Sequence, residues 1–137
     1  LEMRNDQMQF STVDVLGIDL FTGKAGFLKL RAAPSFLKRG ASVRVICNEE
    51  QAKAQYIETE IEAGDIIILL SDGVTDALGT EEIRNALLSS GVQDMKKLVS
   101  ALLQKAAKQG GRTDDMTAMA IRVEGRGKDV SLRQKAV

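Results

Sequence analysis

Carboxylates are the side chains of this chain whose type and spacing could support chemistry. The sequence contains no histidine and a single cysteine, which excludes Ser-His-Asp and Cys-His catalysis and most zinc sites. Aspartates gather instead at two places, residues 71–76 and residues 111–117. Carboxylate oxygens without a nearby His or Cys suit hard divalent cations such as Mg²⁺ and Mn²⁺.

The two acidic clusters adjoin two predicted strands. The apolar run at residues 66–70 predicts a buried strand, and residues 117–123 predict a second strand whose larger apolar side chains share one face. If these strands are antiparallel neighbours, the end of the first and the start of the second meet at one end of the sheet. Asp72 and Asp76 would then lie near Asp114 and Asp115.

A turn is the ordinary explanation for either cluster alone. Asp72-Gly73 after a strand is typical of a turn, and Asp114-Asp115 after two glycines could be a polar loop. Two converging clusters favour a bound cation, because unpaired carboxylates repel each other. Gly73 would let the backbone turn sharply and approach the ion or its waters.

Period-two alternation predicts an antiparallel sheet in the first half of the chain. Residues 13–20 carry apolar side chains on both faces, which favours a central strand. A short turn then leads to residues 27–32, where Leu28 and Leu30 share one face and the cations the other, so we expect a hairpin. Further strands are predicted at residues 35–38, 41–47, 57–62 and 66–70, with Cys47 as a buried small hydrophobe.

Two helices follow these strands. Apolar spacing predicts them near residues 80–90 and 94–109, side by side on one face of the sheet, with Asp94 as the cap of the second. The expected fold is α+β, a mostly antiparallel β-sandwich with helices packed on the sheet face. We expect one incomplete domain over residues 1–124 and a loosely held polar and basic tail over residues 125–137.

Composition narrows the class of partner. Lys plus Arg and Asp plus Glu number 19 each, and aromatic residues make up 4% of the chain, so neither charge nor stacking favours nucleic acid. No apolar run approaches the roughly 20 residues that span a bilayer, so no membrane contact is expected from this segment. The first residues lack a signal-peptide layout, and we expect a cytoplasmic location, or a cytoplasmic domain if the parent protein is membrane-anchored.

Four short motifs, in this order, resemble the metal-dependent (2C-like) protein serine/threonine phosphatases. Residues 70–77 (LSDGVTDA) are similar to their Ser-Asp-Gly element, and residues 114–117 (DDMT) to their closing Asp-Asp/Asn-Met-Thr element. Residues 10–14 (FSTVD) and 29–35 (KLRAAPS) resemble the bacterial branch typified by stage II sporulation protein E. Each motif is weak alone, and together they are specific.

The resemblance implies a β-sandwich that hydrolyses phosphoserine or phosphothreonine with two Mn²⁺ or Mg²⁺ ions. By motif position, Asp72 and Asp114 correspond to metal ligands and hence to catalytic residues. Asp76 and Asp115, with Gly73, correspond to supporting positions of the metal site. The substrate in this branch is a phosphorylated anti-anti-sigma factor, whose dephosphorylation starts a sigma-factor programme.

The resemblance covers residues 5–123 and leaves out the family's earlier Asp-Gly-Met-Gly-His-Gly-like segment, which supplies a metal-bridging Asp. We therefore expect the C-terminal portion of a phosphatase domain, with weak or absent metal binding and no activity alone. Its expected partners are the N-terminal half of the domain, a phosphorylated protein and a second copy of itself. Residues 48–54 replace a Pro-Leu-Gly-containing segment near the family's site. The alternative is a non-catalytic, phosphatase-like binding or regulatory module.

Overall fold

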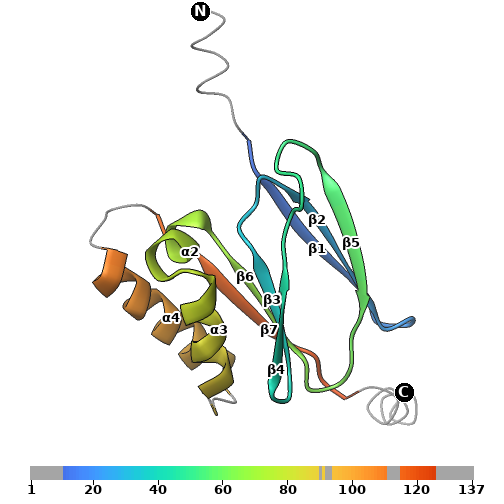
Figure 1. Cartoon of the computed structure of the whole chain (residues 1–137). Coiled ribbons are helices and arrows are strands. Elements are labelled where there is room, and N and C mark those ends of the chain that lie inside the picture. Colours follow the sequence, from blue (N-terminus) through green and yellow to red (C-terminus); the bar gives the residue numbers. More distant parts are fainter. Residues whose placement is uncertain (1–10, 90, 92–93, 111–114, 126–137) are drawn as a thin grey trace, which may run out of the picture.

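The elements of the protein form three layers (Figure 1) in a computed structural model that describes residues 11–89, 91, 94–110 and 115–125. One layer is the sheet β1-β2-β5, made of β1 (Val13–Asp19), β2 (Lys24–Leu30) and β5 (Gln55–Glu60). The next is the sheet β4-β3-β6-β7, made of β3 (Ser35–Arg39), β4 (Ser42–Ile46), β6 (Ile66–Leu70) and β7 (Ala118–Arg122). The helices α2 (Asp72–Leu78), α3 (Thr80–Ser89) and α4 (Met95–Gly110) cover its outer face. Every strand pairing is antiparallel, so the predicted α+β sandwich is confirmed.

Alternation along β6 divides the core into two parts. Ile66 and Ile68 pack toward the helices, whereas Ile67 packs toward the other sheet. Ile67 and Ile68 are wholly buried, and burying an aliphatic side chain of this size contributes about 1.5–3 kcal/mol. A continuous run of apolar residues thus gives a central strand with core on both faces.

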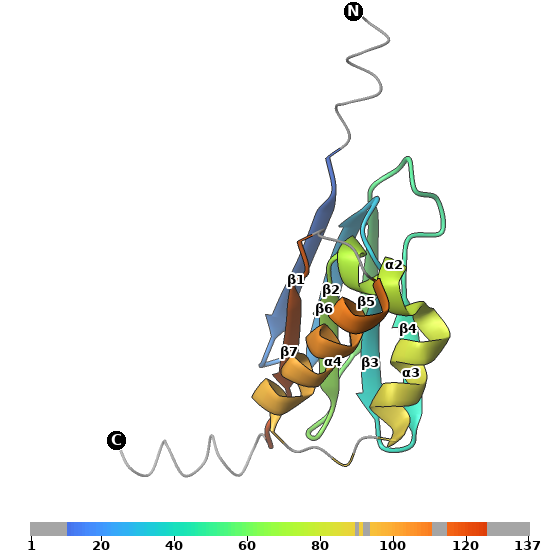
Figure 2. The same cartoon turned by 90° about the vertical axis from the view of Figure 1, so that its left-hand side faces the viewer.

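The two predicted helices are present, and a third was not predicted. Asp94 Oδ1 accepts the backbone N–H of Lys96 at 2.9 Å, which confirms the expected cap of α4. Glu82 of α3 accepts a hydrogen bond from Gln109 of α4 at 2.7 Å, so these helices lie side by side, as Figure 2 shows. No helix within the described residues is long and apolar enough to cross a bilayer.

Helix α2 replaces the turn or loop expected after β6. Its seven residues include Gly73 at the second position and end before Gly79, and glycine and β-branched residues are poor helix formers. The helix forms because Val74 and Leu78, four residues apart, both bury their side chains in the core beneath the helices. Tertiary packing has therefore overridden a weak local preference.

Three expectations about the strands were wrong. β1 is an edge strand, because among the described strands it pairs with β2 alone. The apolar side chain of Val15 on its second face is 52% exposed instead of buried. On β2 the face that carries Lys29 points into the core and Leu28 is partly exposed, because Phe27 lies on the same face as Lys29 and fills the space between the sheets. Cys47 is exposed, because it lies just beyond the last residue of β4.

Asp65 closes the end of the sandwich away from the helix α2. Its side chain is 1% exposed and accepts two hydrogen bonds from the Arg39 guanidinium, at 2.8 and 2.7 Å, and one from the Glu62 backbone N–H at 2.8 Å. Burial acts to raise the pKa of Asp65, but these hydrogen bonds outweigh it and the pKa is lowered. The carboxylate therefore joins β3 to the turn before β6 in its ionised form.

Substituting Asp65 should give a pH-dependent loss of stability. We expect Asp65→Asn to lower the free energy of unfolding at pH 7 by about 2 kcal/mol, typical of hydrogen bonds to a buried charged group. Because the folded pKa is lowered, this contribution is present above the unfolded value of about 3.9 and is lost as pH falls through the folded pKa. Urea unfolding at pH 7 and below pH 4 would measure this, with the exposed Glu58→Gln as control. If the difference in unfolding free energy between wild type and Asp65→Asn does not shrink in acid, the explanation is wrong.

The outer face of the β1-β2-β5 sheet carries an apolar patch formed by Val15, Leu28 and Tyr56, which are 52%, 38% and 63% exposed. The Tyr56 ring lies over Gly26, where any Cβ would overlap it. Among the described residues, the helices cover the other sheet and leave this face open. Exposed apolar patches of this kind usually find a partner.

We expect the apolar patch to produce self-association that depends on protein concentration. Val15→Lys should reduce it, because a charge within the patch would have to be desolvated on association. Met119→Lys is the matched control, since Met119 is also 52% exposed but lies on β7. Sedimentation velocity over a wide concentration range measures the effect. A clean monomer at high concentration, or equal effects of both variants, would be evidence against this.

Candidate functional site

The pairing of β6 with β7 brings the two acidic clusters to one end of the sheet. Leu70 lies opposite Ala118, so the strands are antiparallel neighbours as predicted. Beyond this pair the Ser71 N–H donates to the Thr117 carbonyl at 3.0 Å, and the Thr117 N–H donates to Ser71 Oγ at 2.9 Å. The serine of the Ser-Asp-Gly motif thus extends the strand pairing by one step and places Asp72 beside the segment that leads into β7.

Gly73 has a different role from the one expected. It lies within α2, so it makes no sharp turn. A Cβ added there would lie 2.5 Å from the Asp115 carbonyl oxygen and 3.2 Å from Met116 Cγ. The missing side chain therefore lets the backbone before β7 approach the first turn of α2.

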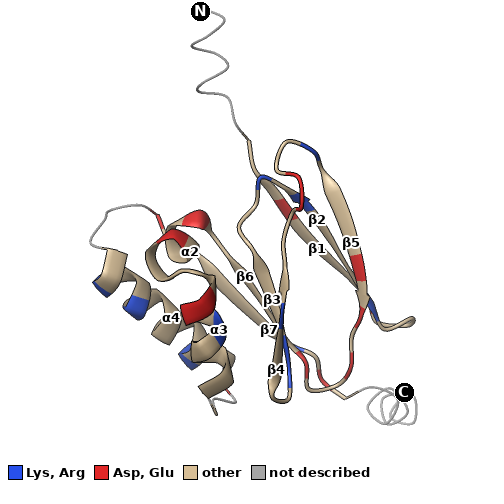
Figure 3. Ribbon diagram, in the orientation of Figure 1, with Lys and Arg blue, Asp and Glu red and all other residues tan. Residues whose placement is uncertain are grey.

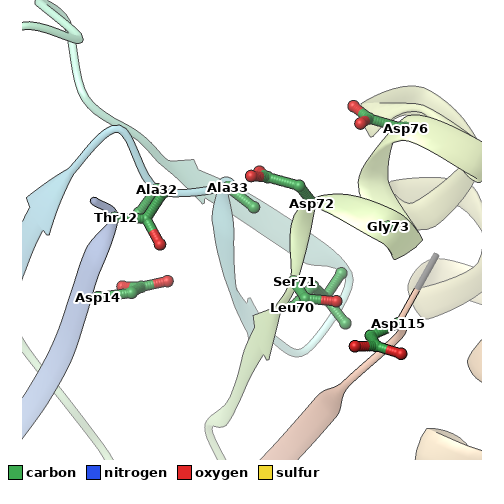
Figure 4. A pocket seen from close by; sticks show the side chains of 10 residues that line it. All are labelled: Thr12, Asp14, Ala32, Ala33, Leu70, Ser71, Asp72, Gly73, Asp76 and Asp115. Atoms are coloured by element: carbon green, nitrogen blue, oxygen red, sulfur yellow. The ribbon is translucent and has the colours of Figure 1, made fainter. Parts of the chain in front are cut away.

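A pocket of about 380 Å³ opens at this end of the sandwich. Figure 4 shows that both sheets contribute to it: one wall comes from β1 and the β2–β3 linker, and the other from the end of β6, α2 and the segment before β7. Its lining residues are Thr12, Asp14, Ala32, Ala33, Leu70, Ser71, Asp72, Gly73, Asp76 and Asp115. Figure 3 shows acidic residues on α2, on β1 and before β7, which are among the segments that line the pocket.

Three of the predicted site aspartates line this pocket, and the fourth lies outside the described residues. Asp72, Asp76 and Asp115 are brought to the same cavity. Asp114 is not described, so its approach to Asp72 stays a prediction. Partial withdrawal from water, then the charges of Asp76 and Asp14, raise the pKa of Asp72. Crowded carboxylates of this kind are relieved by a cation.

The donor set fits a hard divalent ion. Among the described residues that line the pocket, every charged side chain is an aspartate, and Mg²⁺ and Mn²⁺ prefer carboxylate oxygen and water. Within the described part of the chain, no three Asp, Glu, His or Cys side chains group closely enough to hold a metal ion. Asp72 would therefore act with water, and with Asp114 if the prediction above holds, rather than in a closed cage of protein ligands.

Sequence reasoning missed the wall opposite Asp72. Asp14 lines the pocket, and its Oδ1 accepts a hydrogen bond at 2.9 Å from Nζ of Lys29, which is wholly buried. The same Nζ donates to the Ala33 carbonyl at 2.8 Å. The available signal was the hairpin, whose register pairs Asp14 with Lys29.

Comparison with known proteins identifies the family. The family model described as "Stage II sporulation protein E (SpoIIE)" matches residues 1–124. This chain belongs to the stage II sporulation protein E family. Stage II sporulation protein E of Bacillus subtilis (strain 168) is 25% identical over 140 residues, which cover 90% of this chain and 17% of that protein.

Solved structures agree on the fold. The phosphatase domain of SpoIIE from Bacillus subtilis, in a Mn-presoaked form, matches with a TM-score of 0.76 and 22% identity, over 92% of this chain and 66% of that one. The catalytic domain of the serine/threonine protein phosphatase PstP, in complex with two manganese ions, matches with a TM-score of 0.70 and 18% identity, over 90% of this chain and 64% of that one. The fold of this SpoIIE-family chain is thus that of the phosphatase-2C-like domains, and the chain spans just under two thirds of each.

Replacing Gly73 by alanine should separate α2 from the segment before β7. Alanine in a helix normally gains about 1 kcal/mol over glycine, but here the added Cβ would press against the Asp115 carbonyl. We expect a net loss of about 1–3 kcal/mol, as for other overpacked sites. Chemical denaturation measures it. Gly17→Ala is the control, because nothing lies within 4 Å of its Cβ, and an equal effect of both variants would refute the explanation.

Proposed function

We propose that this chain is part of a metal-dependent protein serine/threonine phosphatase domain. The substrate is phosphoserine or phosphothreonine on a cytoplasmic regulatory protein, such as a phosphorylated anti-anti-sigma factor. The observation that carries this proposal is the pocket at the end of β6, where Asp72 and the segment before β7 meet within a phosphatase-2C-like fold. Family membership supports the substrate class.

The charge of the pocket supports metal dependence. Four aspartates line it, and none of the described lining residues is Lys or Arg. A phosphoryl group carries negative charge, so this pocket would repel it unless cations were present. The manganese ions in the solved PstP structure support Mn²⁺ or Mg²⁺ as those cations.

Asp72 and Asp114 would hold the metal, and Asp76 and Asp115 would support the site. Bound ions of this kind activate a water for in-line attack and neutralise charge on the phosphoryl oxygens. Asp72 is fixed by the hydrogen bonds between Ser71 and Thr117. Gly73 lets the backbone of Asp115 come close.

The alternative function is a non-catalytic, phosphatase-like binding or regulatory module. Two observations favour it for the chain by itself. The match covers 66% of the solved SpoIIE domain, and the described residues contain no three-ligand metal group. The two functions differ in whether completing the domain produces turnover.

Activity should appear only when the rest of the domain is supplied. We expect no Mn²⁺-dependent hydrolysis of p-nitrophenyl phosphate by this chain, and turnover when the remaining segment of a relative's domain is joined to it or added in trans. Asp72→Asn or Asp114→Asn should then lower kcat by on the order of 10²-fold or more, because the ions supply several kcal/mol of transition-state stabilisation.

The control for this experiment is Glu58→Gln, an exposed carboxylate on β5, which should leave the rate unchanged. Robust metal-dependent hydrolysis by this chain alone that survives both Asp substitutions would sink the proposal. A completed domain that folds but shows no turnover would favour the non-catalytic module.

A further inference from the structure

A wholly buried lysine lies directly behind the pocket. Lys29 is 0% exposed and extends the inner face of β2, where Phe27 contributes to the core between the sheets. Lysine is almost never fully buried unless it is paired. Its Nζ donates to Asp14 Oδ1 at 2.9 Å and to the Ala33 carbonyl at 2.8 Å.

The Lys29–Asp14 ion pair is not explained by a contribution to stability alone. Desolvation of two charges offsets most of their attraction, and well-packed apolar residues often serve as well. The same two strands place a second aspartate opposite a lysine at their other end, Asp19 opposite Lys24, but there the lysine is exposed. A buried lysine at the pocket end therefore calls for an explanation in terms of the pocket.

Both partners of Lys29 line the pocket, whereas Lys29 itself does not. The ammonium group thus fixes two pieces of one wall from behind, the carboxylate of Asp14 on β1 and the backbone at Ala33 in the β2–β3 linker. That linker includes Arg31, whose φ of 51° lies in the left-handed region and costs energy for a residue with a side chain. On its other side Lys29 is held by Asn48, whose Nδ2 donates to the Lys29 carbonyl at 3.0 Å.

The pairing with Lys29 occupies one oxygen of the Asp14 carboxylate and leaves the other available to the pocket. Lys29 contacts Oδ1, and no hydrogen bond joins Oδ2 to another described residue. Figure 4 shows the side chain extending from β1 toward the strand end that carries Ser71 and Asp72. Because Lys29 offsets part of its charge, Asp14 adds a hydrogen-bond acceptor to the pocket at a smaller electrostatic cost than an unpaired carboxylate would.

We propose that Lys29 is a positioning residue of the pocket, which holds Asp14 opposite Asp72 so that Asp14 accepts hydrogen bonds from the waters of a divalent ion bound at Asp72. This inference rests on the proposed function. Partners of this outer-sphere kind orient the ligands of metal sites, and losing them typically lowers metal affinity 10–100-fold.

A role of Lys29 through its charge and a role in positioning Asp14 predict opposite effects of Lys29→Met on the affinity for Mn²⁺. If the lysine acted only through its charge, removing a cation beside a cation site would tighten Mn²⁺ binding. If it positions Asp14, the substitution should weaken binding, because the carboxylate would no longer be held toward the pocket. Lys29→Met removes the ammonium group but keeps an unbranched side chain only one atom shorter, so the comparison is between charge and position.

The experiment is a Mn²⁺ titration of the full chain into the millimolar range, with free Mn²⁺ followed by electron paramagnetic resonance. Asp14→Asn and Lys29→Met should each raise Kd about tenfold. The double variant should bind no more weakly than Asp14→Asn, since Lys29 acts through Asp14. Lys24→Met and Glu58→Gln are the controls. Lys24 and Glu58 form an exposed ion pair 3.9 Å apart on the same sheet, so replacing either should leave the Kd for Mn²⁺ unchanged. Circular dichroism confirms folding.

The outcomes separate this inference from the proposed function. Unchanged or tighter binding in Lys29→Met, or unchanged binding in Asp14→Asn, overturns the inference while a loss of binding in Asp72→Asn leaves the metal site standing. Wild-type protein that binds no Mn²⁺ overturns the inference, while turnover by the completed domain still decides the proposed function. Equal Mn²⁺ binding by the wild type and Asp72→Asn overturns both. If Lys29→Met fails to fold, Asp14→Asn decides, because it keeps the volume of the side chain.

Discussion

The hydrogen-bonded pairing of β6 with β7 is the constraint on which the candidate site depends. It joins Ser71 to Thr117, 46 residues apart in sequence, and no local preference could bring these segments together. Register is fixed by packing, because small side chains such as Ala120 face the helices while Ile121 faces the other sheet. A slip of one residue would exchange these faces, pushing a bulky side chain against α2 and α4 and moving the segment before β7 away from Asp72.

The second sheet turns that strand end into a pocket. β1 and the β2–β3 linker supply a wall that carries a carboxylate, and Lys29 behind it supplies the compensating charge. The pocket itself stays acidic, and the pKa of Asp72 is raised by its surroundings and by Asp76 and Asp14. A carboxylate with a raised pKa in a cleft, such as Asp72, is typical of functional sites. The acidic lining suits the chemistry of a phosphoryl group only when a cation lies between. Stability and function thus make opposing demands on the same few residues.

Much of this arrangement could be predicted from the sequence, for identifiable physical reasons. The strand at residues 66–70 and the helix capped by Asp94 follow from strong local patterns. Helix α2 could not be predicted, because most of its residues are poor helix formers and it depends on the packing of Val74 and Leu78 in the core. The inward orientation of Lys29 was missed because alternation along β2 shows that its two faces differ. It does not show which face packs against the other sheet. Asp14 became visible as a pocket residue only with the second sheet in place.

Crystals of this chain soaked in MnCl₂ offer the most direct test of a metal centre at the end of β6. Anomalous diffraction at the manganese edge locates the ion without reliance on activity or on the rest of the domain. We expect an anomalous peak in the pocket within direct bonding distance of the Asp72 carboxylate, about 2.2 Å for a hard divalent cation, and its loss in Asp72→Asn. A peak bound elsewhere with the pocket empty, or a pocket peak unchanged by Asp72→Asn, would contradict this expectation.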